Sequence, residues 1–161
     1  MATEIRPAPL DAVREIRHVV LRPHQRPDEI VYEHDDDADA LHLGAYVDGA
    51  LVAIASLTRE PPPRADDPGA WRVRGMATLP AHRDRGLGGE LLERCIEHAR
   101  ERGGTWVWLN GRVPASRFYE RHGFEMVPPE RAAELLRRYW TIPDRQIETS
   151  VVLSRRPAPP P

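Results

Sequence analysis

The stretch HRDRGLGGELLERC, residues 82–95, constrains this chain more than any other feature of its sequence. Three glycines, at positions 86, 88 and 89, follow two arginines and open an amphipathic pattern. Glycine lets an oxygen-rich group approach the backbone without meeting a Cβ atom. The first N–H groups of a helix have no partner within the helix, and the macrodipole adds about half a positive charge there. The stretch therefore predicts either an anion-binding turn that opens a helix or a turn whose glycines serve only the chain reversal.

The helix predicted after Gly86 has one apolar face, because its apolar residues recur three or four positions apart. That face consists of Leu87, Leu91, Leu92, Cys95, Ile96 and Ala99. A free cysteine on such a face behaves as a small buried hydrophobic residue rather than as a nucleophile. The pair Gly103-Gly104 is expected to end the helix. The alternating run WRVRGMAT, residues 71–78, predicts a strand just before the turn.

The rest of the chain alternates strand-like and helix-like runs. Residues 41–47 and 50–57 flank Asp48-Gly49, the strongest short signal for a hairpin. Further strands are expected at 4–6, 105–109, 124–127 and 146–153. Helices are expected at 10–20, 114–122 and 129–140. Irregular loops are expected at 23–40 and 60–69. The pattern predicts a single α/β domain over residues 1–154, built on a mixed sheet, and a disordered proline-rich tail over 155–161.

Composition excludes several function classes. The net charge of −2 gives no global attraction to nucleic acid or to anionic membranes, so an anion site must be local. A single cysteine allows no internal disulfide and no cysteine-built metal site, and we expect no metal. All 23 basic residues are arginine, which excludes a P-loop lysine and a Schiff base. The chain has no long apolar run and no apolar signal segment, and we predict that it is cytoplasmic.

The identity of the anion follows from which glycine motif is present. A dinucleotide-binding fingerprint would need glycine at Leu91, and a Walker loop would need lysine. The sequence fits neither motif, which argues against a different kind of nucleotide-binding enzyme. The run Arg83-Asp84-Arg85-Gly86-Leu87-Gly88 resembles the pyrophosphate-binding motif of the GCN5-related N-acetyltransferase (GNAT) superfamily. That motif binds the diphosphate of acetyl-coenzyme A.

The flanking sequence strengthens the resemblance. RGMATLP, residues 74–80, matches the family's central strand, and WVWLNGRVPASRFYERHGFEMV, residues 106–127, is similar to its second half. The resemblance spans Leu41 to Val127 and is closest to bacterial-type members. It implies a mixed, mostly antiparallel central sheet flanked by helices. Asp84 departs from the pattern, because the family usually carries glycine or another small or polar residue there.

The family's functional residues carry over position by position. The resemblance implies that acetyl-coenzyme A, with no metal, is held by Met76, Ala77, Thr78, Arg83, Asp84, Arg85, Gly86, Leu87, Gly88, Gly89, Asn110 and Ser116. It implies that the Tyr119 phenol acts as the general acid that protonates the departing thiolate. For Asn110, Ser116 and Tyr119, structural roles in a strand end, a helix start and aromatic packing stay open.

The function implied is an N-acetyltransferase that passes an acetyl group directly to an amine acceptor in a ternary complex. The acceptor would be a small amine or an amino-acid-like metabolite, with protein N-termini also open. Candidate bases are Glu33, His34 and His42, and ordered water is a further one. The acidic run EHDDDAD, residues 33–39, would suit a cationic amine, whereas Arg72 or Arg74 would bind a substrate carboxylate or pair with an acid.

The main alternative from another class is a non-catalytic acyl-coenzyme A sensor, which would keep the glycine motif and lose the proton donor. No nucleic acid or membrane partner is expected. The predicted helix over 129–140 would shape either the acceptor pocket or an interface, such as that of a homodimer. The acyl chain preferred and the identity of the acceptor do not follow from the sequence.

Overall fold

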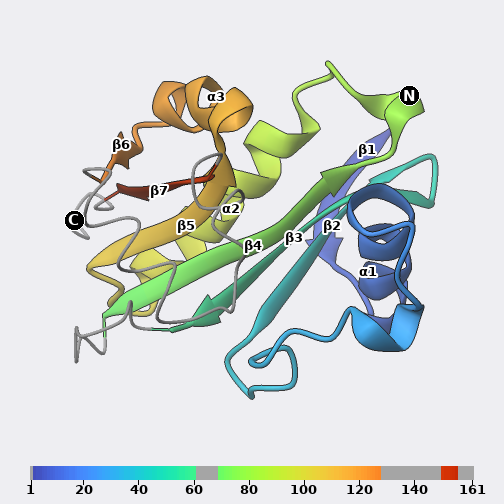
Figure 1. Cartoon of the computed structure of the whole chain (residues 1–161), viewed down its shortest axis with the longest axis horizontal. Helices are drawn as coiled ribbons and strands as arrows, with labels where there is room; N and C mark the ends of the chain where they lie inside the picture. The colour runs from blue at the N-terminus through green and yellow to red at the C-terminus, as the bar shows by residue number, and fades with distance from the viewer. Residues whose placement is uncertain (1, 61–68, 128–149, 156–161) are drawn as a thin grey trace. The chain divides into compact units, whose positions relative to one another are not determined.

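A computed structural model describes residues 2–60, 69–127 and 150–155 (Figure 1). The chain divides into two compact units. We call residues 1–58 and 73–98 the N-terminal unit, and residues 59–72 and 99–161 the C-terminal unit. Strand β4, Ala70–Thr78, contributes to both units.

Seven strands within the described residues form a mixed sheet in the order β1-β2-β3-β4-β5-β7-β6. Their bounds are Thr3–Pro7 for β1, Leu41–Val47 for β2, Ala50–Arg59 for β3, Ala70–Thr78 for β4, Trp106–Arg112 for β5, Glu125–Met126 for β6 and Ser150–Arg155 for β7. Antiparallel pairs join β1 to β2, β2 to β3, β5 to β7 and β6 to β7, whereas β4 and β5 are parallel. The predicted mixed, mostly antiparallel sheet is confirmed.

The hairpin between β2 and β3 confirms the strongest local signal in the sequence. Its two central residues, Asp48 and Gly49, both have positive φ angles, of 49° and 85°. Two-residue turns of this hand match the right-handed twist of the flanking strands. Asp48 also accepts a hydrogen bond from the Ala2 N–H, which ties the start of the chain to the turn.

Two helices cover the sheet in the N-terminal unit, with α1 in front of it and α2 behind it in Figure 1. Helix α1, Leu10–Ile16, continues as a π-helical turn, η1, Arg17–Leu21, and the predicted helix over 10–20 is confirmed. Val13 and Ile16 pack against Ile54 of β3 and Ala77 of β4. This apolar contact fixes α1 against the strands that lead to the glycine turn.

Helix α2, Leu87–Glu101, has the apolar face that its periodicity predicted. Every member of that face is buried: Leu87, Leu91, Leu92, Cys95, Ile96 and Ala99. The helix ends before Gly103, whose φ of 76° needs a residue without a Cβ. Among the residues that the structure describes, no helix combines the length and apolar character needed to cross a membrane.

The C-terminal unit centres on β5. Residues 70–72 of β4 pair in parallel with residues 106–108, and β7 pairs antiparallel on the other side of β5. Trp71 and Trp108 are fully buried there. Helix α3, Ser116–Arg121, follows β5 after a short 3-10 turn, η4, Val113–Ala115, and confirms the predicted helix.

The end of β7 differs from the predicted boundary between the domain and its tail. Arg155, which the sequence assigned to the tail, is the final residue of β7 and donates from Nη1 to the His122 carbonyl at 2.7 Å. The rest of the predicted tail, the loop at 61–68, the helix over 129–140 and the strand residues 146–149 lie outside the described residues.

Candidate functional site

The glycine turn links β4 to α2 in the N-terminal unit. A 3-10 turn, η3, Pro80–His82, follows β4, and α2 begins at Leu87. The Glu90 N–H donates to the Gly86 carbonyl at 3.1 Å, the first helical hydrogen bond. The N–H groups of residues 87–89 therefore precede any partner within the helix. A Cβ atom at Gly86, whose φ is 78°, would meet no described atom within 4 Å, so the mouth of this helix is open.

Asp84 owes its place in this turn to its backbone. Its φ of 61° lies in the left-handed region, and its side chain is exposed. Aspartate is one of the few residues besides glycine that adopt this conformation readily, because its short polar side chain bonds locally. Asp84 thus takes a backbone conformation in which glycine is common.

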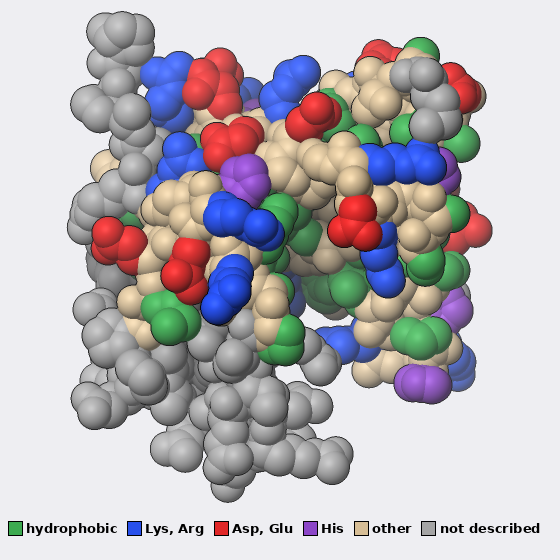
Figure 2. All heavy atoms as spheres, turned by 90° about the horizontal axis from the view of Figure 1, so that it is seen from above, with side chains coloured by type: hydrophobic (Ala, Val, Ile, Leu, Met, Phe, Trp, Pro, Cys, Tyr) green, Lys and Arg blue, Asp and Glu red, His purple; other side chains and the backbone are tan. Residues whose placement is uncertain are grey.

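Two exposed arginines flank the turn. Arg83 donates from Nε to the Thr78 carbonyl at 3.3 Å, which ties the turn to the end of β4. Arg85 precedes Gly86 directly. Figure 2 shows arginines and carboxylates interspersed over the described part of one face of the molecule. The positive character of the turn is therefore local, as the net charge predicted.

The end of β4 is shaped by Gly75. Its φ of 64° interrupts the regular strand just before Met76, Ala77 and Thr78. A Cβ atom at Gly75 would lie 3.0 Å from Arg17 Nε and 3.2 Å from Tyr32 Cε2. Glycine is required here both by the backbone angle and by the close approach of these two side chains.

Tyr119 lies on α3 in the C-terminal unit. Its ring packs edge-on against Phe118 and Phe124, with centroids 5.1 Å and 5.9 Å away. The lack of a side chain at Gly111 lets the ring approach β5, since a Cβ atom there would lie 3.2 Å from Tyr119 Cε2. Burial raises the pKa of the Tyr119 phenol above its ordinary value, so the group stays protonated at neutral pH. Ser116 is the first residue of this helix.

A buried ion pair orients Asn110 in the same unit. Arg72, whose exposed fraction is 1%, donates from Nη1 to Glu60 Oε1 and from Nη2 to Asn110 Oδ1, each at 2.9 Å. A guanidinium group only donates, so the amide oxygen of Asn110 faces Arg72 and its NH₂ group points elsewhere. The sequence left open whether Arg72 binds a substrate or pairs with an acid, and the structure shows the pair with Glu60.

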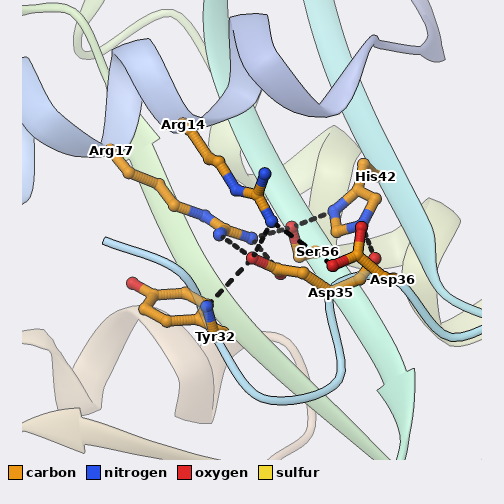
Figure 3. A network of polar contacts seen from close by, with 7 residues as sticks. All are labelled: Arg14, Arg17, Tyr32, Asp35, Asp36, His42 and Ser56. Atoms are coloured by element: carbon orange, nitrogen blue, oxygen red, sulfur yellow. Dashed lines mark hydrogen bonds and ion pairs between the residues drawn. The ribbon is translucent and has the colours of Figure 1, made fainter. Parts of the chain in front are cut away.

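The acidic run is anchored by a second buried arginine (Figure 3). Arg17, whose exposed fraction is 0%, binds Asp35 through both terminal nitrogens, at 2.7 Å and 2.9 Å. Arg17 Nη2 also donates to Ser56 Oγ at 2.8 Å, and Arg14 lies 3.5 Å from Asp35. Asp35 in turn accepts a hydrogen bond from the Tyr32 N–H at 3.0 Å. The carboxylate therefore links the loop backbone to Arg14 of α1 and Arg17 of η1.

The pKa of Asp35 reflects this balance. Burial by itself raises the pKa of Asp35. The hydrogen bonds from Arg17 and the Tyr32 N–H, with the charges of Arg17 and His42, lower the pKa by more than burial raises it. The net pKa lies below the ordinary value of 3.8, so Asp35 is ionised at neutral pH.

The three candidate bases of the sequence differ in their surroundings. Both ring nitrogens of His42 are engaged, Nδ1 with Ser56 Oγ at 2.7 Å and Nε2 with the Asp35 carbonyl at 2.9 Å. His34 Nδ1 lies 2.9 Å from Asp37. Glu33 is exposed. His42 thus belongs to the network of Figure 3, which no sequence pattern announced because its members come from separate elements.

Tyr32 is a residue of this region that the sequence did not suggest. Its ring lies between two guanidinium groups, with Arg17 Cζ 4.0 Å and Arg74 Cζ 3.9 Å from the centroid. Such stacking stabilises a cation by about 0.5–2 kcal/mol, depending on its exposure to water. Arg74, Tyr32 and Gly75 therefore meet at the interruption in β4.

Comparison with known proteins decides the family. The sequence profile of the Acetyltransferase (GNAT) family matches residues 10–124. The chain is 34% identical over 122 residues to YitI, an uncharacterized N-acetyltransferase of Bacillus subtilis. The matched region covers 76% of this chain and 82% of YitI. The chain belongs to the GNAT family.

Solved GNAT structures share the fold. An acetyltransferase of the family from Staphylococcus aureus superposes with a TM-score of 0.72 at 15% identity, over 98% of this chain and 100% of the other. The putative acetyltransferase yncA from Salmonella typhimurium, solved with its cofactor acetyl-CoA, gives a TM-score of 0.68 at 20% identity, over 100% and 97%. These structures show the GNAT fold, and the family match together with the N-acetyltransferase relative shows that the protein is an acyltransferase.

Cys95 lacks the surroundings of a reactive cysteine. It is fully buried on α2, and burial raises the pKa of its thiol to about 12. A neutral, enclosed thiol is a poor nucleophile. A covalent acetyl-cysteine intermediate is therefore disfavoured, as the helical periodicity predicted.

Proposed function

We propose that this GNAT protein transfers an acetyl group from acetyl-coenzyme A to a small amine or amino-acid-like acceptor, by direct attack in a ternary complex. The observation that carries the proposal is the start of α2 at residues 86–89, where three of four residues are glycine, the Leu87 side chain is buried, the space beside Gly86 is open, and Arg83 and Arg85 precede the turn. The proposed compartment is the cytoplasm, where acetyl-coenzyme A is available.

The cofactor residues act through the backbone and through guanidinium groups. The N–H groups of Leu87, Gly88 and Gly89 would donate to the diphosphate, and Arg83 and Arg85 would add charge-assisted bonds. The pantetheine arm would lie along residues 76–78 like an added strand. A backbone N–H of Met76 or Ala77 would donate to the thioester oxygen, and a preorganised donor of this kind stabilises the transition state by about 3 kcal/mol.

Asn110 would supply a side-chain donor. Because Arg72 holds its amide oxygen, the NH₂ group is the part of Asn110 that faces away from the ion pair. That group would donate to a carbonyl oxygen of the cofactor, either directly or through water. Ser116, at the start of α3, is proposed as a weaker contact to the cofactor.

Tyr119 would supply the proton that the departing thiolate needs during acetyl transfer. The neutral amine attacks the thioester carbonyl, a C–N bond forms, and the C–S bond then breaks. The Tyr119 phenol gives its proton to the departing thiolate, and its raised pKa keeps that proton in place beforehand. The amine would lose its proton to water, to Glu33 or to His34; His42 is the weakest of the three side chains for this role, because both of its ring nitrogens are already bonded.

The test combines binding with thiol release. We expect acetyl-coenzyme A to raise the melting temperature, because it binds only the folded state, and an amine panel to release free thiol. Tyr119→Phe should lower kcat by about 100-fold with an unchanged KM for acetyl-coenzyme A, since general acids contribute roughly 10²–10⁴-fold.

Tyr46→Phe is the matched control, because Tyr46 is a buried tyrosine of β2 and has no proposed role in the chemistry. An unchanged kcat for Tyr119→Phe would remove this residue from the mechanism. Binding of acetyl-coenzyme A without thiol release from any amine would favour the acyl-coenzyme A sensor. Absence of binding would reject both functions.

A further inference from the structure

The interruption of β4 at Gly75 brings two side chains of other elements against its backbone. A Cβ atom at Gly75 would lie 3.0 Å from Arg17 Nε and 3.2 Å from Tyr32 Cε2. Arg17 comes from η1 and Tyr32 from the loop at 30–40, and both belong to the N-terminal unit, as Gly75 does. In the proposed function the thioester is held at Met76 or Ala77, directly after Gly75. Side chains that reach Gly75 therefore lie close to the proposed place of acetyl transfer.

The ring of Tyr32 is held from both sides. Arg17 Cζ lies 4.0 Å and Arg74 Cζ 3.9 Å from the ring centroid. Two planar guanidinium groups at these distances would overlap on one face of the ring, so each covers a different face. Arg17 is itself fixed by two hydrogen bonds to Asp35 and one to Ser56. The ring therefore has a fixed direction, and its faces are already occupied by cations.

The backbone of Tyr32 is fixed as well. Its N–H donates to the Asp35 carboxylate at 3.0 Å, and its carbonyl accepts from the Asp35 N–H at 3.1 Å. Figure 3 shows the Tyr32 hydroxyl at the other end of the ring, directed away from these bonds. The side chain is half-buried, and the hydroxyl forms no hydrogen bond with any residue that the structure describes. The loop thus fixes the ring and leaves its polar end without a described partner.

The hydroxyl lies at the Gly75 end of the ring. Cε2, the atom that approaches Gly75, is bonded to the ring carbon that carries the hydroxyl. A phenolic oxygen accepts hydrogen bonds as well as donating one. An attacking amine must be neutral, and its lone pair must point at the thioester carbonyl. An N–H of that amine bonded to a fixed oxygen restricts how the nitrogen can turn, and orientation of this kind accelerates a reaction between two bound molecules.

We propose that the Tyr32 hydroxyl positions the acceptor amine beside Gly75, where its oxygen accepts a hydrogen bond from the amine N–H. The two stacked arginines keep the ring from turning. Tyr32 neither gains nor loses a proton in this role, so the bonds made and broken are those of the proposed acetyl transfer. The inference rests on that proposed function and adds an acceptor contact to it.

Tyr32→Phe is the variant that tests the inference, because it keeps the ring between the two guanidinium groups and removes only the hydroxyl. Thiol release from acetyl-coenzyme A is measured over a panel of α-amino acids and small primary amines, and the best acceptor of the native chain is titrated. We expect kcat/KM for this acceptor to fall by about three- to tenfold, the usual effect of one neutral hydrogen bond. The KM for acetyl-coenzyme A and the melting temperature should not move.

Tyr46→Phe is the matched control. Tyr46 also stacks on an arginine, with Arg6 Cζ 3.5 Å from its centroid, and its Cε2 would lie 3.1 Å from a Cβ atom at Gly44. This second cluster lies on β1 and β2, away from the interruption of β4 in the chain. Each variant removes one hydroxyl from a stacked tyrosine, but only Tyr32→Phe should slow acetyl transfer.

Tyr32→Leu separates the ring from its hydroxyl. This variant should lower the melting temperature, because Arg17 and Arg74 lose the ring on which they stack. Tyr32→Phe should melt at the temperature of the native chain. A fall in the melting temperature of Tyr32→Phe as large as that of Tyr32→Leu would give the hydroxyl a structural role and overturn the inference.

The kinetic outcomes separate the inference from the proposed function. An unchanged kcat/KM for the acceptor in folded Tyr32→Phe overturns the inference, as does an equal loss in Tyr46→Phe. A change confined to the KM for acetyl-coenzyme A would place the hydroxyl at the cofactor and also overturn it. In these cases the native chain still transfers acetyl groups, so the proposed function stands. A native chain that does not bind acetyl-coenzyme A, or releases no thiol with any amine, contradicts the proposed function and the inference together.

Discussion

The glycine turn and the buried network around Arg17 (Figure 3), both in the N-terminal unit, are built in opposite ways. The turn is made of consecutive residues, 83–89, is largely exposed and offers backbone N–H groups. The network is made of side chains from α1, η1, the loop at 30–40, β2 and β3, and its central arginine, Arg17, is fully buried. One depends on the absence of side chains, and the other depends on their mutual pairing.

This difference separates binding from stability. A backbone donor at a helix mouth is held by the helix itself and needs few neighbours. A buried guanidinium group instead costs free energy unless its carboxylate partner stays in place. Substitutions in the turn should therefore affect cofactor binding, whereas substitutions in the network should affect folding first.

The largest effect is expected from Arg17→Met. The change leaves Asp35 buried without its main partner, which typically destabilises a protein by about 3–5 kcal/mol. Urea denaturation at neutral pH measures the free energy of unfolding. Adding Asp35→Leu should recover much of the loss, because neither charge is then buried. Arg6→Met, in an exposed pair with Glu4, should cost no more than about 1 kcal/mol. A similar loss in both single variants would contradict the comparison.

An intermediate effect is expected from Gly86→Ala, with Gly49→Ala as its matched control. Both glycines have positive φ angles and open space where a Cβ atom would lie. Both variants should lose about 1–2 kcal/mol of stability from backbone strain.

Only Gly86→Ala should also weaken acetyl-coenzyme A binding, by roughly tenfold or more, since its methyl group stands at the proposed diphosphate site. Isothermal titration calorimetry measures the affinity. Equal affinities of the two variants for acetyl-coenzyme A would show that the glycine turn does not bind the cofactor.

The smallest effect is expected from the titration of Asp35. Its folded pKa lies below 3.8, so its contribution to stability is fully present above that pH and is lost as the pH falls through the lower folded value. The free energy of unfolding of the native chain should decrease below about pH 4 by up to about 1.4 kcal/mol per pH unit from this one group.

Urea denaturation of Asp35→Asn at pH 5.5, 4.5 and 3.5 provides the comparison. This variant starts less stable, but the difference from the native chain should shrink at the lowest pH. A constant difference across the series would show that Asp35 does not titrate in this window.

The sequence anticipated most of what depends on near neighbours. The hairpin at Asp48-Gly49, the apolar face of α2 and the helix that opens at the glycines all appear where their patterns placed them. The left-handed conformation of Asp84 was not anticipated, although aspartate in place of glycine hinted at it. No local pattern around Tyr32 predicted its contacts, because the two arginines that stack on its ring, Arg17 and Arg74, come from other elements.

The sequence by itself determined the glycine turn that opens α2, the order of strands and helices, and the family, because each depends on residues a few positions apart. Only the tertiary structure decided which charges pair. Arg17 meets Asp35 across 18 residues and Ser56 across 39, and Arg72 meets Glu60 across 12 and Asn110 across 38. The physical reason is that an arginine has the same chemistry wherever it stands, and only packing brings a particular carboxylate within reach of it.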